Sequence, residues 1–249
     1  MRGPVYDRFR RALAETERCV LFTVVEGEDA GKQLLVLESG ETVGDAPASL
    51  AAEAGALIAG GRNRSVELEG SRVLAEVYGP PPRLLVYGAV DLAESLCAAA
   101  HIIGWRAIVA DARPRFATPE RIPSADELIV AWPEEAVAQV APDVWTAVVV
   151  LTHDEKFDVP LLQAALATEA FYVGALGSRR NQERRRERLL EAGVEASRID
   201  DISGPCGLDI GADSQPETAI SIVAEILALR AGREGGRLQQ SKQRIHAEV

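Results

Sequence analysis

An imidazole and a carboxylate follow a strand-like run in the second half of the chain. The run is AVVVL at residues 147–151, and His153 and Asp154 come just after it. Ligand groups in parallel α/β sheets gather beyond the carboxyl ends of strands, so His153 suits acid–base chemistry there, with Asp154 orienting the ring or binding a cation. The alternative is a turn in which Asp154 or Asp158 caps a helix entered at Pro160. We take His153 and Asp154 as the candidate catalytic residues.

A glycine loop follows an earlier strand-like run. Residues 88–93 (GAVDLA) precede a predicted helix, and Asp111 lies 23 residues after Gly88, close to the spacing of a ribose-binding carboxylate in dinucleotide-binding folds. Val90 stands where such a loop needs a glycine, and its side chain would crowd a pyrophosphate. Asp91 would repel an anion at the helix start. The loop therefore either binds NAD(P) despite these residues or belongs to a sheet that binds no dinucleotide there.

A second loop has the form of an anion site. In residues 174–180 (GALGSRR), small residues and a serine expose backbone N–H groups at a helix start, and two arginines add positive charge. Over residues 178–188, six arginines stand against two glutamates. The alternative is a solvated helix in which glutamates pair with arginines. We expect residues 184–188 to be solvated or to face a partner, and a phosphate to be held by Gly177, Ser178, Arg179 and Arg180.

A third loop, GLDIGA at residues 207–212, places Asp209 between two glycines just before the last helix. Tight backbone geometry of this kind indicates a loop near a site, so we include Asp209 and Gly211 among the candidates. The neighbouring Cys206 is of a type that is most often a small buried hydrophobe. The last helix is predicted over 218–230, after the capping box SQPE at 214–217. We expect it to be mostly buried, with a wet or ligand-facing stripe made of Glu217, Ser221 and Glu225.

The composition argues against several classes of protein. The 249 residues include 27 Lys and Arg and 38 Asp and Glu, which gives a net charge of −11. We expect no nucleic-acid binding from so acidic a chain. No apolar run approaches the roughly 20 residues of a membrane-spanning helix, and the first residues lack the apolar core of a secretory signal, so no membrane is expected. The three cysteines are widely spaced without a CxxC motif, which predicts no disulfide framework, no structural metal site and a cytoplasmic location.

These candidate groups need a scaffold, and the first part of the chain predicts a small α+β domain over residues 1–78. Its helical segments are at 6–17 and 47–59. Its strand-like runs are at 19–25, 33–37, 65–68 and 72–78, with a hairpin turn at 69–71 between the last two.

The rest of the chain predicts an α/β domain. Three consecutive prolines after Gly79 predict a linker over 79–82. Beyond it, short apolar runs alternate with helical segments, which is typical of βαβ units. We predict a Rossmann-like parallel sheet with helices on both faces over 83–232, and a mobile tail over 233–249. The predicted strands are 83–87, 106–110, 127–131, 147–151 and 171–176, and the first helix is 91–103.

Residues 83–230 resemble the C-terminal domain of the XdhC/CoxI family, accessory factors for xanthine dehydrogenase and related molybdenum hydroxylases. The resemblance rests on LLVYGAVDLAESL, VADARPRFA, VVVLTHDEKFDVPLLQAAL, FYVGALGSRR and GLDIGADSQPETAISIVAEI. The first 78 residues match only in outline, and the cysteine usual in a glycine-rich segment is missing from residues 43–46 (VGDA). Val90 and Ala93 also replace glycines that are usual in the family.

The resemblance implies a maturation factor rather than an enzyme. It would bind molybdenum cofactor (molybdopterin), a pterin that carries a phosphate, and assist its sulfuration and insertion. The implied partners are an apo molybdenum hydroxylase of the xanthine dehydrogenase or carbon monoxide dehydrogenase type, a cysteine desulfurase and a second XdhC/CoxI-type subunit, and we expect a homodimer. On this chain the predicted cofactor-binding set is Gly88, Asp111, Arg113, His153, Gly174, Gly177, Ser178, Arg179, Arg180, Asp209 and Gly211.

Two other functions stay open at this point. An NAD(P)-dependent oxidoreductase would use Asp111 to bind the ribose and His153 as acid and base. Val90 and the lack of a proton-relay Lys or Tyr motif oppose this function. A scaffold that keeps the fold and binds no ligand is the third hypothesis.

Overall fold

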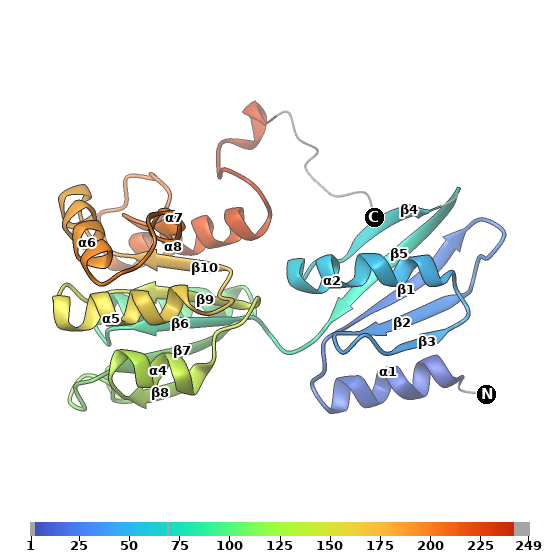
Figure 1. Cartoon of the computed structure of the whole chain (residues 1–249), viewed down its shortest axis with the longest axis horizontal. Helices are drawn as coiled ribbons and strands as arrows, with labels where there is room; N and C mark the ends of the chain where they lie inside the picture. Colours follow the sequence, from blue (N-terminus) through green and yellow to red (C-terminus); the bar gives the residue numbers. More distant parts are fainter. Residues whose placement is uncertain (1–2, 69, 242–249) are drawn as a thin grey trace. The chain divides into compact units, whose positions relative to one another are not determined.

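The computed structural model describes residues 3–68 and 70–241. The backbone forms two compact units with a boundary between Pro80 and Pro81 (Figure 1), and the second unit comprises Pro81–Gly235.

The first unit is built on a five-stranded antiparallel sheet in the order β3-β2-β1-β5-β4. Its strands are β1 (Cys19–Glu26), β2 (Gln33–Leu37), β3 (Thr42–Gly44), β4 (Arg64–Leu68) and β5 (Ser71–Tyr78). Its helices are α1 (Pro4–Ala14), the short η1 (Ala48–Leu50) and α2 (Ala51–Gly60).

The alternation of side chains along β1 explains why both faces of this sheet are covered. Val20, Phe22 and Val24 face a core that includes Leu57 of α2. Cys19 and Leu21, at the odd positions, join a second cluster with Ala12 of α1. A strand places successive side chains on opposite faces, so a nearly continuous apolar run needs a helix on each side. The first helix begins at Pro4, two residues before the predicted 6–17 segment, because Pro suits the first helical position.

The second unit contains a six-stranded sheet in which every pair of neighbouring strands is parallel. The order is β11-β10-β9-β6-β7-β8. Read from the first strand of the unit, this is the 3-2-1-4-5-6 order of Rossmann folds. The strands are β6 (Arg83–Tyr87), β7 (Arg106–Asp111), β8 (Glu127–Val130), β9 (Thr146–Val150), β10 (Tyr172–Ala175) and β11 (Ile202–Ser203).

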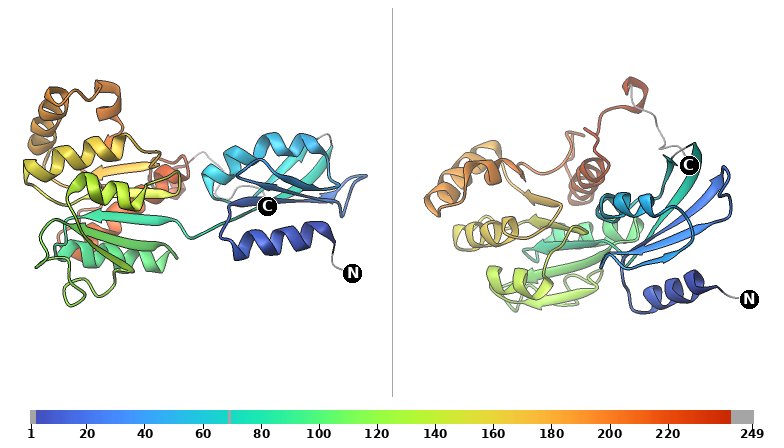
Figure 2. Two further views of the ribbon diagram at one scale, coloured as in Figure 1. Left: turned by 60° about the horizontal axis from the view of Figure 1, so that its bottom comes forward. Right: turned by 45° about the vertical axis from the view of Figure 1, so that its right-hand side comes forward.

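Helices cover both faces of this sheet, as predicted (Figure 1 and Figure 2). Leu84 and Val86 of β6 pack in one core with residues of α3 (Asp91–Ile102) and α8 (Gln215–Arg230). Leu85 and Tyr87 of the same strand pack in the other core, with residues of α4 (Pro133–Val140) and α5 (Glu155–Leu166). The remaining helices of the unit are α6 (Arg179–Glu191) and α7 (Ala196–Asp200).

The side of the last helix that is buried differs from the predicted one. Ser221 is buried, and its Oγ donates to the carbonyl of Leu208 at 2.6 Å. Ile220 and Leu229 are exposed instead. The expected wet stripe is therefore wrong for Ser221, because the loop before the helix folds back over this face and accepts its hydroxyl.

Two findings concern the whole of the described chain. None of its helices combines the length and the apolar composition needed to cross a membrane. Of the segment predicted to be a mobile tail, residues 238–240 form the short helix η2 (Leu238–Gln240), and residues 242–249 lie outside the described part of the chain.

Candidate functional site

The strand order reverses between β6 and β9, and a cavity of about 350 Å³ lies beyond the carboxyl ends of these strands. Open α/β sheets bind ligands at this switch point, because the connections leave it in opposite directions. His153 comes from the loop after β9, as predicted. The other lining residues are Val90, Asp91, Leu92, Arg121, Leu151, Leu176 and Gln215.

The lining of this larger cavity is half apolar and half polar. Leu151 and Leu176 are apolar parts of the lining, as is Val90, the N-cap of α3. The start of α8 contributes Gln215. Arg121 donates to Asp91 at 3.3 Å, so the two charges in the lining balance. Such a site suits a flat organic ring that polar groups orient.

A smaller cavity of about 100 Å³ lies between α5 and α6, and His153 lines it as well. His153 thus lines both cavities. The lining is completed by Glu155, Asp158, Val159, Asn181, Arg184, Arg185 and Arg188.

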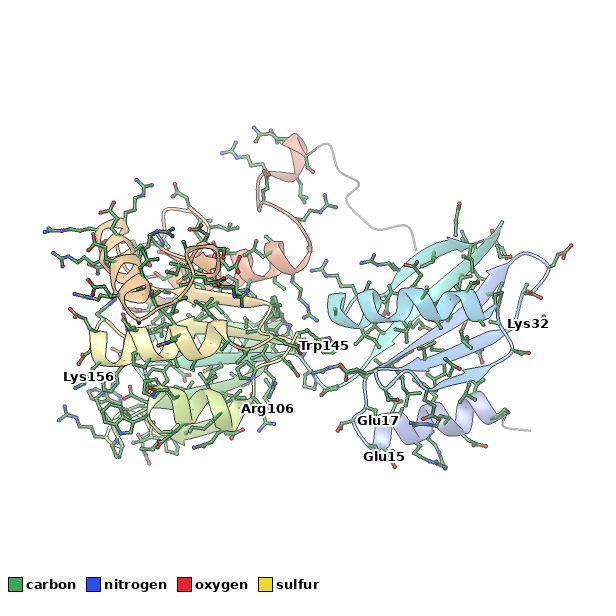
Figure 3. The ribbon with its side chains drawn as sticks, in the orientation of Figure 1. Glu15, Glu17, Lys32, Arg106, Trp145 and Lys156 are labelled. Atoms are coloured by element: carbon green, nitrogen blue, oxygen red, sulfur yellow. The ribbon has the colours of Figure 1, made fainter. Side chains whose placement is uncertain are left out.

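A buried ion pair forms one wall of the smaller cavity. Arg185 donates through Nη2 to Asp158 at 2.9 Å, and the side chains are only 6% and 8% exposed. Thr152 also donates its hydroxyl to Asp158. Asp158 therefore caps no helix. Asp154 caps α5, which begins at Glu155 rather than at Pro160, by accepting from the Lys156 N–H at 3.2 Å. Lys156 lies in the first turn of this helix (Figure 3).

Arg185 corrects the expectation that residues 184–188 are solvated or face a partner. Basic side chains project outward from α6 (Figure 3). Arg185 and Leu189 of this helix are buried instead. Arg185 also donates to the Leu176 carbonyl at 3.2 Å and to Gln182 at 2.5 Å. Its Nε–H has no acceptor among the described residues. The buried Arg185 thus links the middle of α6 to Asp158 of α5, although the many charged residues of this helix suggest that its arginines are exposed.

Asp111 lies where the sequence predicts, at the end of β7, but its oxygens are occupied. Oδ1 accepts from the backbone N–H and Nε of Arg113, and Oδ2 accepts from Nη2 of Arg113 and the N–H of Ala89. The side chain is 1% exposed. Although burial alone would raise its pKa, the Arg113 hydrogen bonds lower the pKa of Asp111 below its ordinary value. This carboxylate holds the 88–93 loop against β7, where the NAD(P) hypothesis needs it free for a ribose.

The predicted Gly174 has a packing role. A Cβ there would lie 2.4 Å from the Tyr172 hydroxyl, and that hydroxyl donates to Glu225 of α8 at 2.6 Å. Burial and the Glu225 carboxylate raise the pKa of the nearby Cys206 thiol to about 12. Cys206 is therefore a protonated, buried side chain at neutral pH.

The remaining candidates line neither cavity. Gly88 packs against Thr152 in the turn after β6. Ser178 caps α6 by accepting from the Asn181 N–H at 3.3 Å, and Arg179 and Arg180 are exposed. Asp209 and Gly211 are exposed in the loop before α8. The part of the chain that the structure describes contains no cluster of three or more metal-ligating His, Cys, Asp or Glu side chains.

His153 is thus the one predicted residue found in both cavities. No sequence pattern pointed to Arg121, which reaches the site from a loop without a motif. A signal for Gln215 existed, because the capping box fixed the start of α8 at the switch point. Asn181 directly follows the loop where the anion site was predicted, and Arg184 lies one turn beyond it.

The strand order and the cavity at its switch point define a Rossmann-like α/β protein. A family model described as the XdhC Rossmann domain matches residues 84–226. The chain belongs to this XdhC family, which confirms the resemblance stated from the sequence.

Named relatives agree with this assignment. The chain is 35% identical over 151 residues to a probable xanthine dehydrogenase subunit of Bacillus subtilis (61% of this chain, 44% of the relative). It is 30% identical over 157 residues to the molybdenum cofactor insertion chaperone PaoD of Escherichia coli (63% and 43%). The chain thus spans less than half the length of these curated relatives. A crystal structure described as a xanthine dehydrogenase from Bacillus halodurans matches with a TM-score of 0.69 and 26% identity, over 92% of this chain and 67% of that one.

Proposed function

We propose that this protein is an accessory factor that binds molybdenum cofactor as its cargo and assists insertion of the cofactor into a molybdenum hydroxylase. Two relatives are named as a molybdenum cofactor insertion chaperone and as a probable subunit of a xanthine dehydrogenase. We place the protein among maturation factors rather than enzymes. Sulfuration of the cofactor beside a cysteine desulfurase, a homodimeric state and a cytoplasmic location belong to the same proposal.

The observation that carries the proposal is the larger cavity at the switch point. Its volume of about 350 Å³ falls in the range of about 300–1,000 Å³ that small-molecule sites occupy. A pterin has flat apolar faces and a polar edge. Leu151 and Leu176 suit the faces, and His153, Arg121 and Gln215 suit the edge.

The cysteines support a role for another protein chain. All three cysteines of this chain are buried and form no disulfide. Burial raises the pKa of Cys19 to about 11 and that of Cys97 to about 12. A thiol ligand for the molybdenum would therefore come from another chain, in place of the cysteine that residues 43–46 lack.

The test measures binding of molybdenum cofactor that has been released from a hydroxylase under anaerobic conditions. Quenching of the protein's tryptophan fluorescence is the readout. We expect micromolar affinity, and a loss of at least about tenfold in Leu176→Glu, because a charge would be desolvated against the ring. Leu190→Glu on the exposed side of α6 is the matched control and should bind like the wild type. Absence of binding, with and without the client hydroxylase, would contradict the proposal.

NAD(P) binding is the second candidate, favoured by the Rossmann strand order. It needs a free carboxylate at the end of β7, whereas Asp111 accepts four hydrogen bonds. Titration of NADH fluorescence with the protein tests it: an enhancement that saturates would support this candidate, and an unchanged signal would remove it.

A further inference from the structure

The smaller cavity carries an excess of positive charge. Three of its lining residues are arginines and two are carboxylates. Arg185 pairs with Asp158, and Arg188 pairs with Glu155. Arg184 has no carboxylate partner among the described residues. With His153 neutral, the lining therefore has a net charge of one positive unit.

A buried donor in the same wall also lacks an acceptor. Arg185 is 5% exposed, and its Nε–H has no hydrogen-bond partner within the described chain. Buried polar groups are nearly always satisfied, so this donor would gain an acceptor if a ligand oxygen entered the cavity and the Arg185 side chain shifted to meet it. Asn181 supplies a further amide to the lining.

Two further cavities of the second unit have no such excess. In the larger cavity Asp91 balances Arg121. Arg185 also borders a cavity of about 270 Å³ on the other side of α6, where Arg186 is paired with Asp200 and Glu183 adds a negative charge. An anion is thus favoured between α5 and α6.

The space suits a compact anion. A water molecule needs about 10–15 Å³ of such volume, so about 100 Å³ has room for a phosphate group. Arginine and amide N–H groups are suitable donors for phosphate oxygens. His153 lines both this cavity and the larger one, so one ligand reaching past the histidine would occupy both.

We propose that the cavity between α5 and α6 binds the phosphate of a phosphate-monoester ligand whose ring lies in the larger cavity. Arg184 and Asn181 donate to the phosphate, Arg185 adds positive charge in the wall beside it, and His153 stands at the junction. The identity of the ring rests on the proposed function, whereas the phosphate subsite does not. The site lies one turn along α6 from the predicted loop at Gly177 to Arg180.

The test compares 6-hydroxymethylpterin, its phosphate monoester and inorganic phosphate as probes of the full chain, by calorimetry and by thermal melting. We expect Arg184→Gln to weaken binding of the phosphate monoester about 10–100-fold, because one charge-assisted hydrogen bond is lost. The affinity for the unphosphorylated pterin should be unchanged. Arg180→Gln removes the same charge one turn earlier, and its effect should be about tenfold smaller. Circular dichroism checks that both exposed substitutions leave the fold intact.

Two outcomes would overturn the phosphate subsite, and a third would separate it from the proposed function. An equal or larger effect of Arg180→Gln would overturn the subsite and favour the helix-start loop. The subsite would also be overturned if Arg184→Gln weakened binding of both pterins equally. If neither pterin binds, but inorganic phosphate raises the melting temperature of the wild type and not of Arg184→Gln, the subsite stands while the proposed function fails.

Discussion

Asp111 shows how one residue serves the site without touching a ligand. Its two oxygens each accept two hydrogen bonds, which tie the loop after β6 to the end of β7. The loop leads directly into Val90 and Asp91 of the larger cavity. The geometry of the switch point therefore depends on this carboxylate being ionised.

We predict that Asp111 contributes to stability in a pH-dependent way. Its folded-state pKa is lowered, so its contribution is full at neutral pH and is lost as the pH falls below its ordinary value of 3.8, through the folded-state pKa. Asp111→Asn should cost about 1–3 kcal/mol at pH 7 in urea unfolding, and the difference from the wild type should shrink in acid. The exposed Asp213→Asn is the control. A difference that stays constant down to pH 3 would contradict the prediction.

Single residues also show what the sequence could and could not predict. His153 was predictable, because its position after a buried strand alone places it at the sheet edge. The burial of Arg185 was not, because it depends on Asp158, which lies 27 residues earlier on another helix. A helix with many arginines indicates solvent exposure, and nothing local marks the one that turns inward. Arg113 lies only two residues after Asp111 and was itself a predicted site residue, but the sequence does not show that its side chain folds back onto the carboxylate.

At the scale of elements, two features fix the start of α8: its capping box and the loop that precedes it. The Ser214–Glu217 capping box closes its first turn. The preceding loop docks on the helix: the Gly207 N–H donates to Glu225 at 2.9 Å, and Ser221 donates to Leu208. Because α8 delivers Gln215 to the larger cavity, this loop positions part of the site.

We predict that Gly207→Ala is more destabilising than Gly211→Ala. Both glycines have positive φ, +110° and +73°, which costs an alanine about 1–2 kcal/mol in the left-handed region. A Cβ on Gly207 would also lie 2.5 Å from the Ser221 Oγ, whereas nothing lies within 4 Å at Gly211. Urea unfolding measures both variants. Equal losses would show that the contact between the loop and α8 adds no stability.

Elements with a strong pattern were predicted closely, and short ones were missed. The strands at 33–37 and 83–87 have the predicted bounds. The three-residue β3 and two-residue β11 were not predicted, because they exist only by pairing with longer strands. The sequence did not decide whether Asp154 or Asp158 caps α5, because both residues are good caps. The burial of Asp158 shows that Asp154 is the cap.

At the scale of the whole molecule, the buried members of the two cores of the second unit all come, among the described residues, from that unit. Their buried members run from Leu84 to Ile226. The clusters of the first unit draw on residues up to Tyr78. The domain bounds 1–78 and 83–232 stay predictions, and this division of the cores supports them.

We predict that residues 81–235 fold on their own. The fragment keeps both helix layers and the complete parallel sheet, so it should unfold in a single cooperative urea transition and keep the near-ultraviolet circular dichroism of its buried Trp105 and Trp145. A gradual transition without a near-ultraviolet signal would contradict this.

The pairing of β6 with β9 has a consequence for how the protein is made. Residue 87 ends the first strand of the sheet, but its central neighbour begins only at Thr146, 59 residues later. At about 5–20 residues per second, a ribosome takes about 3–12 s to supply it. During that interval one edge of β6 has no partner strand, while the antiparallel sheet of the first unit is already complete. Until β9 is made, the nascent chain therefore exposes an unpaired edge of a buried strand, where wrong pairing can occur.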